Sequence, residues 1–66
     1  SQGHDRTLLR GDPANRSFSV LYLRGDKVIA MDTVNAPRDH LAIRKLMAAG
    51  APIDADRLAD PSVPIA

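Results

Sequence analysis

The chain has 66 residues, no cysteine, and nine Lys or Arg residues against eight Asp or Glu residues, for a formal net charge of +1. A chain this short forms one domain at most and buries only about 60% of its unfolded surface. The composition excludes a disulfide-stapled scaffold and a strongly basic nucleic-acid-binding domain. It predicts that stability comes from a partner chain or from further parts of the same protein.

The distribution of apolar and aromatic residues restricts the function further. No apolar run approaches the roughly 18 residues of a membrane-spanning helix, and no signal segment is visible. The aromatic side chains are Phe18 and Tyr22, and both fall in a predicted strand, so no platform remains on which bases could stack. We therefore expect a cytoplasmic protein that binds neither membranes nor nucleic acid.

The first predicted element is a short strand from Asp5 to Arg10, in which Leu8 and Leu9 point to opposite faces. Gly11 to Asn15 follows and has the composition of a turn. Glycine permits positive φ there, and proline lacks the N–H that a strand ladder needs.

A β-hairpin is predicted from Phe18 to Val34, with Gly25-Asp26 as its two-residue loop. This loop pairs Leu23 with Val28, and the pairing continues as Tyr22–Ile29, Leu21–Ala30, Val20–Met31 and Phe18–Thr33. Alternation then places two apolar sets on opposite faces. One set is Phe18, Val20, Tyr22, Ile29 and Met31, and the other is Leu21, Leu23, Val28 and Ala30.

The main helix is predicted to begin after Asn35, which can cap it, with Pro37 in its first turn. It runs to about Ala49 and ends at Gly50. Its apolar face is expected to cover the hairpin face that holds Phe18, and Leu41 points to solvent. The second hairpin face is then uncovered, so we expect it to be an interface, formed by Leu21, Leu23, Val28 and Ala30.

The C-terminal segment predicts one further helical turn, Ala55 to Leu58, capped by Asp54 and with Leu58 directed inward. The predicted fold class is therefore α+β. It consists of a three-stranded antiparallel sheet in meander order, one main helix packed on one face, and a short C-terminal helical turn.

Arg-Gly-Asp occurs twice, at residues 10–12 and 24–26. An adhesion motif is one interpretation, but the flanking apolar runs require a strand-ending turn at both places. Glycine and aspartate are the residues that such turns select. We therefore interpret both copies as turns.

No catalytic, metal-binding or nucleotide-binding pattern is visible in these residues. His4 and His40 lack a nearby Cys or poised Ser and lack zinc-type spacing, so we interpret them as surface residues. Asp54, Asp56 and Asp60 do not follow the calcium-loop spacing and are better explained by capping and solvation. Neither a GxGxxG nor a GxxxxGK[ST] loop occurs. We expect no catalytic, cofactor or metal residues in this chain.

Several stretches together resemble a known family. They are Arg10-Gly11-Asp12-Pro13, the segment from Phe18-Ser19-Val20 to Asp32-Thr33-Val34-Asn35, and Ala49-Gly50 followed by Leu58-Ala59-Asp60-Pro61. In order and spacing they resemble the C-terminal domain of FAD-dependent ferredoxin reductases of oxygenase systems, from Gly3 to Ile65.

The resemblance implies a parent flavoprotein that transfers electrons from NAD(P)H through FAD to a [2Fe–2S] ferredoxin. Residues 1–66 are then its C-terminal interface domain, without its first strand and both nucleotide-binding domains. The expected partners are those missing domains and the ferredoxin, and the fragment alone is expected to form a homodimer or larger homo-oligomer. The alternative is a free-standing small α+β module for protein–protein interaction or assembly.

Overall fold

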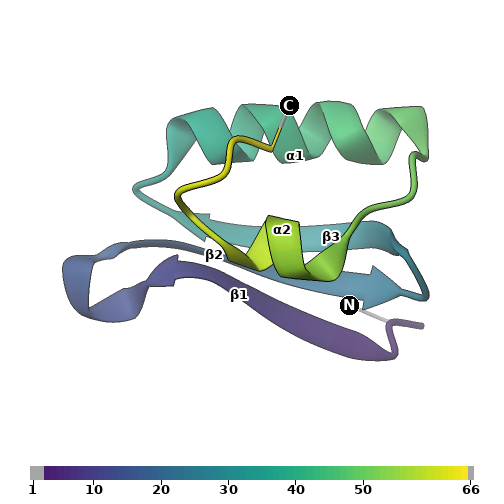
Figure 1. Ribbon diagram of the computed structural model, residues 1–66, viewed down its shortest axis with the longest axis horizontal. Coiled ribbons are helices and arrows are strands. Elements are labelled where there is room, and N and C mark those ends of the chain that lie inside the picture. Colours follow the sequence, from purple (N-terminus) through teal and green to yellow (C-terminus); the bar gives the residue numbers. More distant parts are fainter. Residues whose placement is uncertain (1–2, 66) are drawn as a thin grey trace.

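The computed structural model describes residues 3–65. Its sheet contains β1 (Arg6–Asp12), β2 (Ser17–Arg24) and β3 (Lys27–Val34), antiparallel and in the order β1-β2-β3. A 3-10 turn, η1 (Pro13–Asn15), joins β1 to β2, and the helices α1 (Pro37–Ala49) and α2 (Ala55–Ala59) follow. Figure 1 shows both helices on the same side of the sheet. The predicted α+β meander with one main and one short helix is confirmed.

The Gly25-Asp26 pair forms a turn, as predicted, whereas Gly11 and Asp12 are the last two residues of β1 and pair with Phe18 and Ser17 of β2. Gly25 has φ of 60° and forms with Asp26 the loop between β2 and β3. Gly11 has φ of 94°, and a Cβ there would lie 2.7 Å from the Ser17 carbonyl oxygen, so the close approach of β2 requires glycine. Asp12 then caps η1 by accepting from the Ala14 N–H at 2.9 Å.

The hairpin register differs from the prediction beyond its first pair. Leu23 pairs with Val28 as expected, but a β-bulge then shifts the register, so that Tyr22 pairs with Ala30 rather than Ile29. Leu21 consequently pairs with Met31. A shift of one residue moves each later side chain of β3 to the other face of the sheet. The residues of the turn fix the pairing next to the turn, but they carry no information on the bulge that directly follows the Leu23–Val28 pair.

The face that the helices cover also differs from the prediction. Leu21 and Ile43 are fully buried, and they form one core with Leu8, Leu23, Val28 and Leu58. The helix α1 therefore covers the Leu21 face, and the prediction that it covers the Phe18 face was wrong. Both faces are apolar, but only the Leu21 side is extended by Leu8 of β1 and Leu58 of α2.

The predicted interface of Leu21, Leu23, Val28 and Ala30 rested on the premise that this face is uncovered, and the observed burial contradicts that premise. The first three are between 0% and 6% exposed and belong to the domain's own core. Ala30, shifted by the bulge, lies opposite Tyr22 and hence on the uncovered face. The uncovered face of the sheet thus carries a different set of residues.

Helix ends follow the local sequence, with one exception. Gly50 ends α1 with φ of 62° and donates its N–H to the Met47 carbonyl, as predicted. Asp54 accepts from the N–H groups of Asp56 and Arg57 at the start of α2, and Leu58 is 5% exposed. Asn35 does not cap α1: the N-cap is Ala36, and the Asn35 side chain donates to the Arg16 carbonyl.

Among the described residues, neither helix is long and apolar enough to cross a membrane.

Candidate functional site

One face of the sheet is left uncovered by the helices, and its residues lie outside the core that residues 3–65 form. Its positions form three rows across the strands in the observed register. We call this surface the open face, and it comprises Thr7, Tyr22 and Ala30 in the first row, Leu9, Val20 and Asp32 in the second, and Gly11, Phe18 and Val34 in the third.

Most of the open face is apolar and accessible. Leu9 is 47% and Val34 41% exposed, while Phe18, Val20, Tyr22 and Ala30 are half-buried. The residues packed against the core are all elsewhere. Exposed apolar surface is the kind of surface that proteins use to contact other proteins.

One polar pair interrupts this apolar surface. The Tyr22 hydroxyl donates to Asp32 Oδ2 at 2.6 Å, and the carboxylate raises the pKa of Tyr22 above its usual value, mainly through this hydrogen bond. The His4 ring meets the Tyr22 ring edge-on, with centroids 5.1 Å apart. The tyrosine hydroxyl therefore stays protonated and orients the Asp32 carboxylate.

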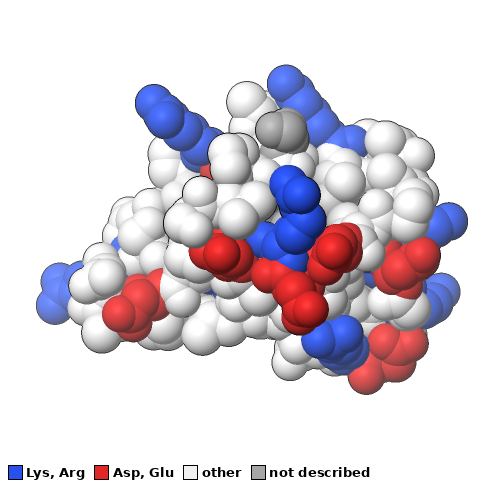
Figure 2. All heavy atoms as spheres, viewed as in Figure 1, with Lys and Arg blue, Asp and Glu red and all other residues white. Residues whose placement is uncertain are grey.

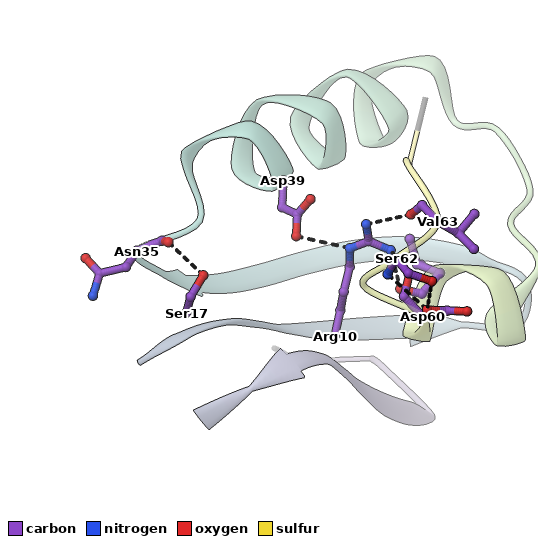
Figure 3. A network of polar contacts seen from close by, with 8 residues as sticks. Arg10, Ser17, Asn35, Asp39, Asp60, Ser62 and Val63 are labelled. Atoms are coloured by element: carbon purple, nitrogen blue, oxygen red, sulfur yellow. Dashed lines mark hydrogen bonds and ion pairs between the residues drawn. The ribbon is translucent and has the colours of Figure 1, made fainter. Parts of the chain in front are cut away.

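On the covered side, one buried cation joins the sheet to both helices and to the C-terminal segment. Arg10 is 3% exposed and makes an ion pair with Asp39 of α1 through Nε at 3.0 Å. Its remaining nitrogens donate to the carbonyl oxygens of Leu58, Asp60 and Val63 at 3.0, 2.8 and 2.7 Å. Figure 3 shows the guanidinium between α1 and this segment.

Sequence reasoning missed this network, because Arg10 was considered only as the first residue of an Arg-Gly-Asp turn. One signal was available: Arg10 lies two residues after Leu8 and therefore shares its face. A charged residue on a core face needs partners there. Its burial also shows that this copy of the motif does not present its arginine to solvent.

The outer surface of α1 is basic. Arg38, Arg44 and Lys45 are exposed, and exposed Leu41 lies among them. Within residues 3–65 the ion pair joins Arg10 to Asp39. The three cations on α1 therefore form no ion pair there. Figure 2 shows basic side chains at the top, over α1, and a mixed group of acidic and basic side chains lower down, over α2. We call Arg38, Arg44 and Lys45 the basic face.

The candidate acid–base residues are not brought together. His40 Nδ1 lies 2.9 Å from the Thr33 hydroxyl, while His4 lies against Tyr22. Ser19 is fully buried, and its hydroxyl has no hydrogen-bond partner among the described residues. Within residues 3–65 neither histidine is therefore paired with the Ser19 hydroxyl.

The aspartates of the C-terminal segment serve as caps. Asp54 caps α2, and Asp60 accepts from the hydroxyl and the N–H of Ser62, which lowers the pKa of Asp60. Within residues 3–65 no group of three His, Cys, Asp or Glu side chains is placed to hold a metal ion.

Fold and site together define a small α+β domain with one closed and one open sheet face. A family model described as "Reductase C-terminal" matches residues 1–66. The chain belongs to this family of reductase C-terminal domains, and the resemblance found in the sequence is confirmed.

Relatives are similar over most of the chain. The chain is 50% identical over 94% of its length to the 5,5'-dehydrodivanillate O-demethylase ferredoxin reductase subunit of Sphingobium sp., and covers 15% of that protein. It is 42% identical over 98% of its length to putidaredoxin reductase of Pseudomonas putida, again covering 15%. It is 50% identical over 86% to the anthranilate 1,2-dioxygenase system ferredoxin–NAD(+) reductase component of Burkholderia cepacia, covering 14%.

Replacing Arg10 tests the central network. The substitution Arg10→Met leaves Asp39 and three carbonyl groups without their partner, so we expect a loss of about 3–5 kcal/mol in the free energy of unfolding, measured in urea. Arg10→Lys keeps the positive charge but has fewer N–H donors than the planar guanidinium. The free energy of unfolding should therefore fall less than in Arg10→Met. The control is Arg24→Met, which removes an exposed hydrogen bond to Gly3 and is expected to lose less than about 1 kcal/mol. Equal losses for Arg10 and Arg24 would contradict this role of the network.

Proposed function

We propose that this chain is the C-terminal interface domain of an NAD(P)H-dependent ferredoxin reductase of an oxygenase system, and that the open face docks on the rest of that protein. The observation that carries the proposal is the family match along the whole chain. The names of the relatives support the reductase, and the relatives are far longer than the chain, which covers 14–15% of them.

Redox chemistry belongs, in this proposal, to the part of the parent outside residues 1–66. Bound FAD supplies the link between hydride transfer from NAD(P)H and single-electron transfer to a [2Fe–2S] ferredoxin. This chain has no glycine-rich phosphate loop of the kind that holds a dinucleotide. Its own contribution is a shaped, rigid docking surface. We further propose a cytoplasmic location, as expected for a reductase that takes its electrons from NAD(P)H.

The open face is suited to such docking. Leu9 and Val34 are 47% and 41% exposed, and fully burying an aliphatic side chain stabilises an interface by roughly 1.5–3 kcal/mol. The core and the Arg10 network fix the sheet from its helix-covered side. Little conformational entropy is therefore lost when the open face is covered. A rigid apolar face therefore favours docking on a second, preformed surface.

The full-length gene product tests this function. We expect it to bind FAD, to oxidise NADH or NADPH and to reduce a [2Fe–2S] ferredoxin. The variant Leu9→Lys/Val34→Lys should weaken docking at least about tenfold, because two buried apolar contacts are lost. In calorimetry the domain should then unfold separately from the rest of the protein.

The matched control is Ala14→Lys/Ala49→Lys, which adds the same charge at exposed positions away from the sheet. It should leave a single joint transition. A gene product without flavin or reductase activity contradicts the proposed function and favours the free-standing assembly module.

We also propose that the isolated 66-residue chain self-associates through the open face, because nothing else then covers it. Sedimentation at increasing concentration should show a homodimer or larger oligomer, and Leu9→Lys/Val34→Lys should be monomeric. The Ala14→Lys/Ala49→Lys control should still associate. A clean monomer of the unsubstituted chain at high concentration contradicts this proposal.

The basic face on α1 favours a second role, contact with the ferredoxin. Arg38, Arg44 and Lys45 are exposed and have no acidic partner within residues 3–65. Unpaired charges of one sign on a surface attract a partner of the opposite sign and accelerate encounter. We propose that this face binds an acidic surface of the ferredoxin.

Charge reversal tests this contact in the full-length reductase. Arg44→Glu/Lys45→Glu should raise the KM for ferredoxin at least about tenfold and make this KM less dependent on salt concentration. The rate at which NAD(P)H reduces ferricyanide should be unchanged. The control Arg6→Glu/Lys27→Glu reverses two exposed cations outside α1 and should leave the KM unaltered. An equal KM increase in both variants assigns the effect to overall charge and contradicts the contact.

A further inference from the structure

The open face contains one charged side chain, that of Asp32. It lies opposite Val20 in the register, and its neighbours along the same face of β3 are Ala30 and Val34. A carboxylate is thus set among apolar side chains on the surface that we propose to be covered. The groups that the docking surface places beside this carboxylate decide whether that surface can cover the open face.

Within the described residues, Asp32 is only partly satisfied. Its Oδ2 accepts one hydrogen bond, from the Tyr22 hydroxyl at 2.6 Å. The ion pair within residues 3–65 joins Arg10 to Asp39, on the opposite side of the sheet. In the uncovered domain the remaining acceptor sites of Asp32 are accessible to water, because this residue is exposed.

Covering the open face removes that water. Burying a charge without a counter-charge costs several kcal/mol, and one neutral hydroxyl donor does not offset this. A guanidinium offsets it best, since its planar fork donates two parallel N–H groups to one carboxylate. Tyr22 already fixes the orientation of the carboxylate, so the geometry of such a pair is prepared before docking.

We propose that the surface of the rest of the reductase that docks on the open face presents a basic side chain, arginine by preference, that pairs with Asp32. This pair sets the register of the two surfaces, while the surrounding apolar residues supply contact area. The inference rests on the proposed docking function and adds the chemistry of the partner surface to it.

Thiol labelling in the full-length reductase tests the pair. Leu9→Cys places a thiol at the other end of the Asp32 row, and its rate of reaction with a maleimide, followed on its own peptide by mass spectrometry, reports how often the open face is uncovered. Lys27→Cys at the exposed hairpin tip gives the rate of an uncovered thiol. Adding Asp32→Leu should accelerate labelling of Leu9→Cys at least about tenfold, because a basic side chain loses its partner.

The shape-preserving variant Asp32→Asn should also accelerate labelling, and Asp26→Leu, in the hairpin loop, should not. If Asp32→Leu slows labelling or leaves it unchanged while Leu9→Cys stays protected, the docked surface has no basic partner; this inference then fails and the docking survives. If Leu9→Cys in the otherwise unsubstituted protein reacts as fast as Lys27→Cys, the docking itself fails. Val34→Cys repeats the measurement in the event that Leu9→Cys disturbs the face.

Discussion

The hydrogen bonds of Arg10 are the constraint on which the rest of the structure depends. One guanidinium, 3% exposed, connects β1 to Asp39 of α1 and to three carbonyl groups of α2 and the segment after it. A domain of this size has a small core and no disulfide. Arg10 can satisfy its donors only on the side where these groups lie, so it binds both helices to one face of the sheet.

The function proposed for the domain follows from that one-sidedness. Because both helices are held on the Leu21 side, neither of them covers the Phe18 side, although most of its residues are apolar. The open face is therefore a consequence of the same packing that stabilises the core. The charges also differ between the two surfaces: within residues 3–65 the cations Arg38, Arg44 and Lys45 of α1 form no ion pair, and the open face carries the carboxylate of Asp32. The domain thus presents two surfaces of different chemistry, one apolar around Asp32 and one basic.

The elements of this fold were predictable, and the face that we propose as its interaction site was not. Proline, glycine and aspartate set the turns and helix ends through local backbone geometry, so η1, the Gly25-Asp26 loop, Gly50 and the Asp54 cap were all predicted from adjacent residues. Asn35 was the exception, because its amide bonds to Arg16, nineteen residues earlier in the chain. The site depended on the face of each strand residue, and the bulge beside Tyr22 changed that face for most of β3.

The sequence alone determined the α+β class, the meander order and the family, because these follow from apolar periodicity, turn chemistry and the order of short motifs. Only the tertiary structure decided which sheet face is closed. Two faces of similar apolar content have similar burial energies, so periodicity cannot distinguish them. The choice is made by contacts between residues distant in the chain: Leu58 with the core, and Arg10 with Asp39 and Val63.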